Sequence, residues 1–183
     1  GATALGLLAY AVGIEPYAIE TIRLDIHVPR LPHAFDGYTI YQISDLHTSQ
    51  IGRRERWLAR KLESLPSADL IALTGDLVHT ARGIASFLEL AQSFKAHDGS
   101  YAIFGNSEHK NGVRPHQFAV TLEENGIIPL LNSHAILPRG GETIALVGVD
   151  DPVSDKDCMA QALNGVSQDI CTFLLMHSPD SIA

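Results

Sequence analysis

The sequence predicts an α/β domain built around a largely parallel β-sheet. Two observations lead to this fold class: short apolar runs alternate along the chain with amphipathic stretches, and several of those runs end on an acidic, amide or imidazole side chain. Alternation of strands and helices at this pace is typical of β-α-β units. Polar residues directly after strands fit such a sheet, because its ligands bind beyond the carboxyl ends of the strands.

Strands are expected where apolar and β-branched residues run continuously or alternate with period two. Residues 19–28, IETIRLDIHV, alternate and indicate a half-exposed strand, whereas 69–75, DLIALTG, is continuous and indicates a buried one. The turn PRGG separates the two strands expected around it. In chain order, the runs expected to contain strands are 19–28, 38–44, 69–75, 100–106, 127–137, 142–149 and 170–177.

Helices are expected where apolar residues recur three and four positions apart. The segment 53–65 places Trp57, Leu58, Leu62 and Leu65 at this spacing, and 116–126 ends in an Asn-Gly stop signal. In chain order, the expected helices are 53–65, 84–94, 116–126 and a short one near 157–163.

Composition places the chain among soluble globular domains. It has 183 residues, of which 45% are hydrophobic and 19% charged, enough for one domain with a core. The formal net charge of −8 makes binding to a nucleic-acid backbone unexpected. An anionic substrate is still permitted, because bound cations would reverse the local field. Cys158 and Cys171 fit neither a disulfide framework nor a zinc-ligand spacing.

The first fifteen residues are set apart from the domain. The run from Ala2 to Ile14 is apolar and shorter than the ~20 residues that a membrane span takes. We expect 1–15 to be the end of a membrane anchor or export signal, the alternative being a buried helix of the domain. Residues 16–183 are expected to be the domain itself.

Metal-binding side chains follow four of the expected strands, at the point where each strand ends. They are Asp45 and His47, then Asp76, then Asn106, and finally His177. A dinuclear hydrolytic site needs one carboxylate between two cations ~4 Å apart. Asp45, His47 and Asp76 would hold the first ion, and Asp76, Asn106 and His177 the second. Mixed imidazole, carboxylate and amide ligands suit Mn, Fe, Zn or Co better than Mg or Ca.

Each motif has a simpler interpretation when taken alone. An Asp after a strand can cap a helix, Gly-Asn is a common turn, and a histidine at a strand end can be structural. Their occurrence together and in this order indicates metal binding. The other histidines, expected to be surface or structural residues, are His27, His33, His79, His97, His116 and His134.

The order SDLH, TGDLV, FGNSEH and LLMHSPD resembles the calcineurin-like metallophosphoesterase superfamily. The stretches LPHAFDGYTIYQISDLH and GVDDPVSD are similar to its membrane-associated bacterial branch. That branch includes phosphatases and phosphodiesterases acting on lipid-linked or cell-envelope substrates, among them UDP-diacylglucosamine pyrophosphate hydrolases. The resemblance, over about residues 15–183, implies a two-sheet sandwich of mixed sheets flanked by helices in four layers, and the five metal ligands named above.

The sequence departs from the family pattern at two places. The family's final G-H-x-H motif does not occur before the sequence ends at SPDSIA, so the C-terminal part of the domain is expected to be missing and this piece to turn over substrate poorly. Ser107 stands where the family has its catalytic histidine. His109 is the candidate to replace it, and Glu108, in the acidic position of the motif, is expected to orient the nearby histidine. The alternatives are a water, Ser107 or an Arg, or a leaving group that needs no protonation.

Two further segments have open interpretations. Asp150 and Asp151, in GVDDP, form either a turn with capping acids or a pair beside the metals. The basic segment 53–61, RRERWLARK, is either a solvated helix face or a surface resting on anionic lipid headgroups.

The function expected from these features is metal-dependent hydrolysis of a phosphomonoester, phosphodiester or pyrophosphate, with a metal-bridging hydroxide as nucleophile. The rival is a metal-binding or scaffold member of the same fold with weakened catalysis, supported by Ser107. The expected partner is a phosphate-ester substrate, with lipid-linked or cell-envelope compounds among the candidates. The expected location is at a membrane through the N-terminus, with export as the alternative.

Overall fold

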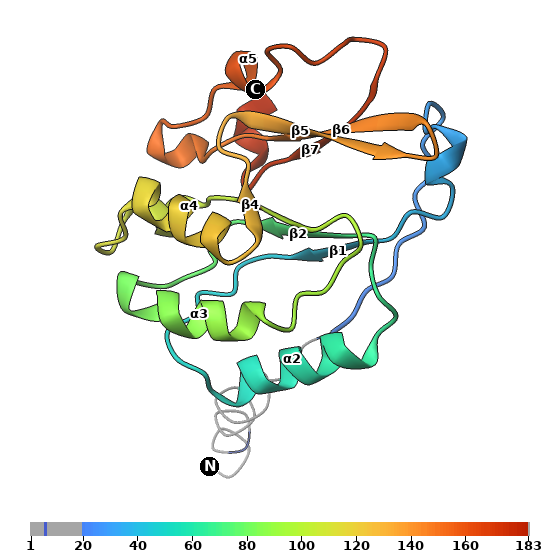
Figure 1. Ribbon diagram of the computed structural model, residues 1–183. Coiled ribbons are helices and arrows are strands. Elements are labelled where there is room, and N and C mark those ends of the chain that lie inside the picture. The colour runs from blue at the N-terminus through green and yellow to red at the C-terminus, as the bar shows by residue number, and fades with distance from the viewer. Residues whose placement is uncertain (1–5, 7–19, 183) are drawn as a thin grey trace.

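The computed structural model describes Gly6 and residues 20–182 (Figure 1). Its strands are β1 (Ile40–Ile43), β2 (Leu70–Thr74), β3 (Ser100–Ile103), β4 (Ile127–Pro129), β5 (Ser133–Arg139), β6 (Glu142–Gly148) and β7 (Cys171–Leu175). Its α-helices are α2 (Arg53–Ser64), α3 (Ile84–Ala91), α4 (Pro115–Glu124) and α5 (Met159–Ala162). Short 3-10 turns are η2 (His33–Phe35), η3 (Ala81–Gly83), η4 (Asn106–His109), η5 (Pro152–Ser154) and η6 (Pro179–Ile182).

The first sheet is parallel throughout, in the order β1-β2-β3-β4. Each crossover carries a helix, α2 after β1, α3 after β2 and α4 after β3. Parallel strands run in the same direction, so all their carboxyl ends reach one edge of the sheet. The loops that follow β1, β2 and β3 therefore meet at that edge.

The second sheet has the order β5-β6-β7. β5 and β6 form an antiparallel hairpin in which Arg139 pairs with Glu142, and β7 joins β6 in parallel. The turn between β5 and β6 contains Gly140 and Gly141, both with positive φ, as tight hairpin turns require. The expected run 127–137 is divided, because β4 belongs to the first sheet and β5 to the second.

Three cores separate four layers (Figure 1). Neighbouring residues of one strand are buried in different cores. Leu73 of β2 faces α2, α3 and α4, whereas Ala72 faces the second sheet. In β6, Leu146 faces the first sheet and Val147 faces α5. This alternation is the period-two pattern of strands buried on both faces. The predicted two-sheet fold with flanking helices is confirmed.

Two details of the prediction are wrong. Within residues 20–28 no strand forms, and Ile22, Leu24 and Ile26 are 72–77% exposed. An alternating segment becomes a strand only where a neighbour supplies backbone partners, and no described strand pairs with this one. The first sheet is also parallel rather than mixed.

The expected anchor or signal falls on residues 1–15, which lie outside the described residues apart from Gly6. Within the described part, no helix has the length and apolar character needed to cross a bilayer.

Candidate metal centre

The loops after β1 and β2 run side by side beyond the sheet edge. The Asp45 N–H donates to the Gly75 carbonyl at 3.1 Å, and the His47 N–H donates to the Asp76 carbonyl at 2.8 Å. These bonds continue the pairing of the two strands after the regular ladder has ended. Asp45, His47 and Asp76 are therefore placed by backbone contacts.

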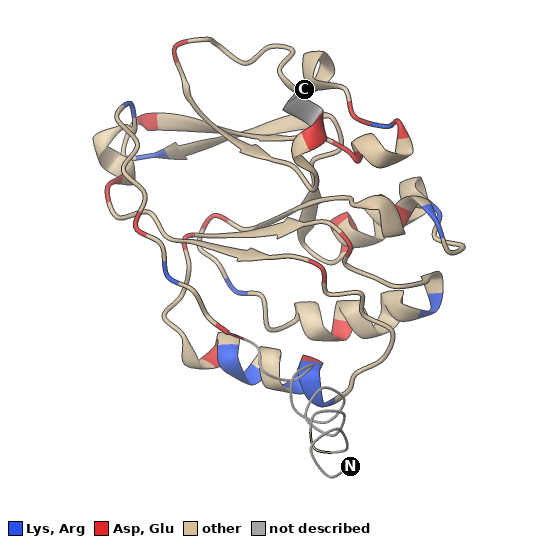
Figure 2. Ribbon diagram, turned by 180° about the vertical axis from the view of Figure 1, so that it is seen from behind, with Lys and Arg blue, Asp and Glu red and all other residues tan. Residues whose placement is uncertain are grey.

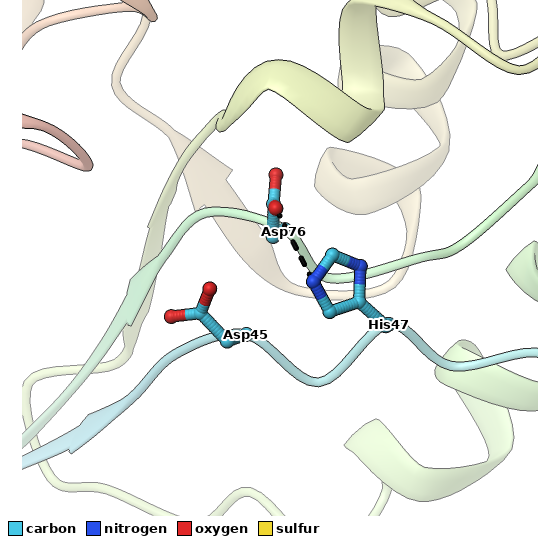
Figure 3. A group of neighbouring side chains, drawn as sticks. All are labelled: Asp45, His47 and Asp76. Carbon is cyan, nitrogen blue, oxygen red and sulfur yellow. Dashed lines mark ion pairs between the residues drawn. The ribbon is translucent and has the colours of Figure 1, made fainter.

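All three of these residues have left-handed backbone conformations, with φ of 55° at Asp45, 43° at His47 and 53° at Asp76. A non-glycine residue in this region costs about 1–2 kcal/mol, so three close together indicate a functional constraint. The turns keep the side chains together: one donor atom from each lies within 4.8 Å of the other two. Figure 3 shows Asp45 and His47 on one loop and Asp76 on the neighbouring loop.

Asp76 lies between two histidines. Its Oδ2 is 3.3 Å from His47 Nε2 (Figure 3), and its Oδ1 is 3.7 Å from His177 Nε2. His177 comes from the loop after β7, in the other sheet. The Asp76 side chain is only 6% exposed, whereas that of His47 is 40% exposed. One carboxylate thus presents a different oxygen to each imidazole, with one side of the group open to solvent.

The tautomer of His177 follows from its second contact. Its Nδ1 lies 2.9 Å from the Thr74 carbonyl oxygen, which only accepts hydrogen bonds. Nδ1 therefore carries the proton in neutral His177, and the lone pair is left on Nε2, which faces Asp76. A hydrogen bond from the far ring nitrogen to a carbonyl is the usual way in which proteins orient a metal-ligating histidine.

Two glycines allow this close approach. A Cβ on Gly75 would stand 2.6 Å from His177 Nδ1, and a Cβ on Gly105 would overlap Asp76 Oδ1. Gly75 also has a φ of +93°, a backbone conformation that residues with a side chain rarely adopt. The glycines in TGD and FGN are therefore part of the site, because any side chain there would push Asp76 or His177 away.

The 3-10 turn η4 closes the site. Its half-buried first residue, Asn106, precedes Ser107, whose N–H donates to Asp76 Oδ1 at 2.9 Å. Ser107 Oγ lies 3.4 Å from His47 Nδ1. Glu108 is fully buried and accepts hydrogen bonds from the N–H groups of Asp76, Val78 and Gly105 at 2.9–3.1 Å. Burial raises the pKa of Glu108 and the negative charge of Asp76 adds to this, although the backbone N–H groups oppose both.

The comparison with protein families agrees with this geometry. A model described as calcineurin-like phosphoesterase matches residues 38–181. The chain belongs to this family. The family predicted from the order of the motifs is confirmed.

Three curated relatives illustrate the family. The protein named uncharacterized metallophosphoesterase YkuE, from Bacillus subtilis, is 30% identical over 98% of this chain and 64% of its own length. A zebrafish (Danio rerio) transmembrane protein with metallophosphoesterase domain is 28% identical over 87% of this chain and 39% of that protein. The UDP-2,3-diacylglucosamine pyrophosphatase LpxG of Chlamydia muridarum is 32% identical over 57% of this chain and 32% of that protein. The chain spans 64% of the length of YkuE and 61% of the length of a second Bacillus subtilis relative, the protein named uncharacterized metallophosphoesterase YkoQ.

The donor set fits divalent cations of the transition series. Asp45, His47 and Asp76 supply carboxylate and imidazole atoms within 4.8 Å of one another. His177 adds an oriented Nε2 on the other side of Asp76. Imidazole and carboxylate together suit Mn, Fe, Zn or Co, and this family of phosphoesterases uses divalent metals.

His109 lies in a different environment from these donors. Its Nε2 is 2.6 Å from Asp150 Oδ1, its side chain is 8% exposed, and its ring stands edge-on to Phe104 at 6.1 Å. Asp150 follows β6, so this hydrogen bond joins η4 to the segment after the second strand of the second sheet. The structure therefore brings Asp45, His47, Asp76 and His177 together with Ser107 beside them, and it turns His109 toward Asp150.

Asp150 and Asp151 combine features of both sequence interpretations. Asp151 occupies the N-cap position of η5, as a turn acid would, but its side chain makes no cap bond. Within the described residues its two carboxylate oxygens are buried without a hydrogen-bond partner. Asp150 contacts His109, two residues from Ser107.

Sequence reasoning missed three parts of the site. The Thr74 carbonyl that orients His177 had no signal, because backbone groups are not distinguished by residue type. The glycines of TGD and FGN stand beside the predicted ligands in the sequence, but the close approach of side chains that they allow was not predicted. Glu108 was expected to orient the nearby histidine, whereas in the structure its carboxylate accepts backbone hydrogen bonds that join the loops after β2 and β3.

Proposed function

We propose that this chain is the catalytic part of a metal-dependent phosphoric ester hydrolase acting on a phosphomonoester, phosphodiester or pyrophosphate. The observation that carries the proposal is the placement of Asp76, with one oxygen toward His47 and the other toward His177. A carboxylate shared between two imidazoles in a partly open site is the arrangement that a two-metal hydrolase needs.

The assignment of ligands follows the two sides of Asp76. Asp45, His47 and Asp76 would hold one cation, and Asp76, Asn106 and His177 the other. Cations bound there supply a water nucleophile near neutral pH and neutralise charge on the phosphoryl oxygens. Glu108 keeps the loops in register, and the Ser107 N–H holds Asp76 Oδ1. The role of His109 as the catalytic histidine stays a prediction. Because its Nε2 contacts Asp150, Nδ1 is the ring nitrogen that remains to contact a substrate.

The proposed substrate is a phosphate ester carried by a lipid or a cell-envelope molecule. Support comes from LpxG, whose name describes a pyrophosphatase of a diacylated sugar nucleotide. Support for a location at a membrane comes from the relative named as a transmembrane protein. The net charge of −8 argues against nucleic acid as the substrate.

The test is a comparison of Asp76→Asn with Asp25→Asn, an exposed carboxylate in the N-terminal segment, made in the product of the complete gene. Binding of Mn²⁺ is measured by calorimetry, and release of nitrophenol from p-nitrophenyl phosphate and bis-p-nitrophenyl phosphate is followed with Mn, Zn, Fe and Co. We expect Asp76→Asn to lower Mn²⁺ affinity by about 100-fold or more, because it removes the shared ligand, and to abolish release. Asp25→Asn should match the unchanged chain.

Two results would contradict the proposal. Unchanged Mn²⁺ binding by Asp76→Asn would remove Asp76 from the metal centre. Metal binding that depends on Asp76, without any release above background, would identify the rival function, a metal-binding member with lost catalysis.

A further inference from the structure

The outward face of α2 carries positive charge without interruption over most of its length. Three exposed side chains, Arg53, Arg56 and Arg60, lie three and four residues apart and so share one face of the helix. The half-buried Trp57 and Lys61 adjoin them at the same spacing. Figure 2 shows Lys and Arg on this helix.

The opposite face of α2 packs against the core of the domain. Leu58 and Ala59 pack on the core formed with the first sheet, and Trp57 is not among the described residues of that core. A rotation of about 100° per residue places Trp57 between Arg53 and Lys61, away from the packed face. The indole therefore belongs to the outward, basic face.

The acids of α2 leave this face uncompensated. Glu55 is 7% exposed, and its carboxylate is occupied by the Gly52 N–H at 2.8 Å and by Arg54 at 2.8 Å. Glu63 is exposed in the last turn, three residues after Arg60, and is the one exposed acid on this face among the described residues of α2. Among the described residues, Arg56, Arg60 and Lys61 form no ion pair with a carboxylate. Arg56 donates instead to the Ile51 carbonyl at 3.2 Å, which leaves its charge in place.

This concentration of charge stands out against the rest of the chain. The protein has 13 basic and 21 acidic residues, and α2 alone contains five of the basic ones. Like charges four apart destabilise a helix by about 0.2–0.5 kcal/mol per pair, so the arrangement does not serve the stability of α2. A surface of one sign on a protein of the opposite sign indicates an anionic partner.

We propose that this basic face, formed by Arg56, Trp57, Arg60 and Lys61, docks the protein on an anionic lipid surface. Trp57 favours a membrane, because an indole with an apolar body and a polar N–H suits the headgroup level of a bilayer. In the fold, α2 lies in the helix layer on the side of the first sheet that faces away from the second sheet (Figure 1). A helix of 12 residues gives a strip about 18 Å long, enough for several headgroups. This proposal does not depend on the phosphoesterase activity.

Trp57 is the single tryptophan of the chain and reports directly on this face. Its emission is followed while the protein is titrated with vesicles of phosphatidylcholine alone or of phosphatidylcholine with phosphatidylglycerol. We expect a blue shift, and quenching by brominated lipid, only with the anionic vesicles. Each basic residue near such a surface contributes about fivefold to partitioning, so Arg56→Gln, Lys61→Gln and Arg60→Gln together should weaken binding about 100-fold.

The matched control is Arg30→Gln, Lys95→Gln and Lys156→Gln, which removes the same charge from exposed positions outside α2. It should bind within a few-fold of the unchanged chain, and circular dichroism checks that both triple variants remain folded.

Equal weakening by the two triple variants would mean that only net charge matters, and it would overturn the proposal. So would equal binding to neutral vesicles, or vesicle binding without a change in Trp57 emission, because another segment would then make the contact. Binding of a duplex oligonucleotide through these residues, with no vesicle binding, would identify nucleic acid as the partner instead.

Discussion

Single residues at the metal centre are held in conformations that their side chains alone would not select. Asp45, His47 and Asp76 have φ of 43–55°, a region that disfavours side chains with a Cβ. The surrounding hydrogen bonds maintain them: the backbones of His47 and Asp76 are joined to each other, and the Asp76 N–H is bound by Glu108. The strain at the donors is thus maintained by neighbours that need not touch a substrate.

Substitution of Glu108 tests whether its hydrogen bonds maintain these loop conformations. Glu108→Ala removes the acceptor of three backbone N–H groups and leaves them buried without partners. We expect the free energy of unfolding, measured by urea denaturation, to fall by about 3 kcal/mol or more. Glu89→Ala, on the exposed side of α3, should change it by less than about 0.5 kcal/mol. If Glu108→Ala lowers the free energy of unfolding no more than Glu89→Ala does, the loops keep their conformation without the Glu108 carboxylate.

At the scale of elements, a polar cluster joins the two sheets at the end opposite the metal centre. Arg139, the last residue of β5, lies 2.5 Å from Asp69 Oδ1, just before β2, and its guanidinium stands 5.2 Å from the centre of the Tyr38 ring. The Asp69 carboxylate also accepts the Thr39 N–H at 2.8 Å. Burial alone would raise the pKa of Asp69, but the hydrogen bonds from Arg139 and Thr39 and the Arg139 charge outweigh it and lower this pKa.

The lowered pKa has a definite consequence for stability. A carboxylate with a depressed pKa in the folded state stabilises the protein above its unfolded pKa of about 3.9, and this contribution is lost as the pH falls through the folded value. We expect Asp69→Asn to be less stable than the unchanged chain at pH 7, with a difference that shrinks as the pH falls below about 4. Urea denaturation between pH 3 and 7 measures it, with exposed Asp169→Asn as control. A difference that stays constant to pH 3 would contradict the role of the charge.

At the scale of the whole molecule, the candidate metal centre depends on the packing of the two sheets. His177 comes from the second sheet and contacts Thr74 and Asp76 of the first. The core between the sheets includes Leu70, Ile103 and Leu146. Loss of this packing would therefore separate His177 from Asp76 even if each sheet kept its own strands.

Gly148, the last residue of β6, lies close to Leu130 and Ile103 on the side of the first sheet. A Cβ there would overlap Leu130 and stand 2.8 Å from Ile103 Cγ2. We expect Gly148→Ala to lower the free energy of unfolding by about 1–3 kcal/mol through overpacking. It should also weaken Mn²⁺ binding, because the second sheet must move. Ile136→Ala, 45% exposed on the neighbouring β5, is the comparison. Equal effects of the two substitutions would show that the gap between the sheets tolerates a methyl group.

The sequence by itself determined the local structure and the kinds of donor. Continuous apolar runs predicted β2, β3 and β7, and helical spacing predicted α2, α3 and α4, because these patterns reflect which faces are buried. It also predicted that Asp45, His47 and Asp76 would converge, since parallel strands end at one edge. It could not distinguish residues 20–28 from a strand, because alternation does not say whether a partner is present.

Only the tertiary structure decided which distant groups meet. Thr74 and His177 are 103 positions apart, yet their hydrogen bond sets the histidine tautomer. His109, close to Ser107 in sequence, contacts Asp150 because η4 packs beside η5, which follows Asp151. Periodicity reports the burial of a residue and not the identity of its neighbour, which depends on how the two sheets are packed against each other.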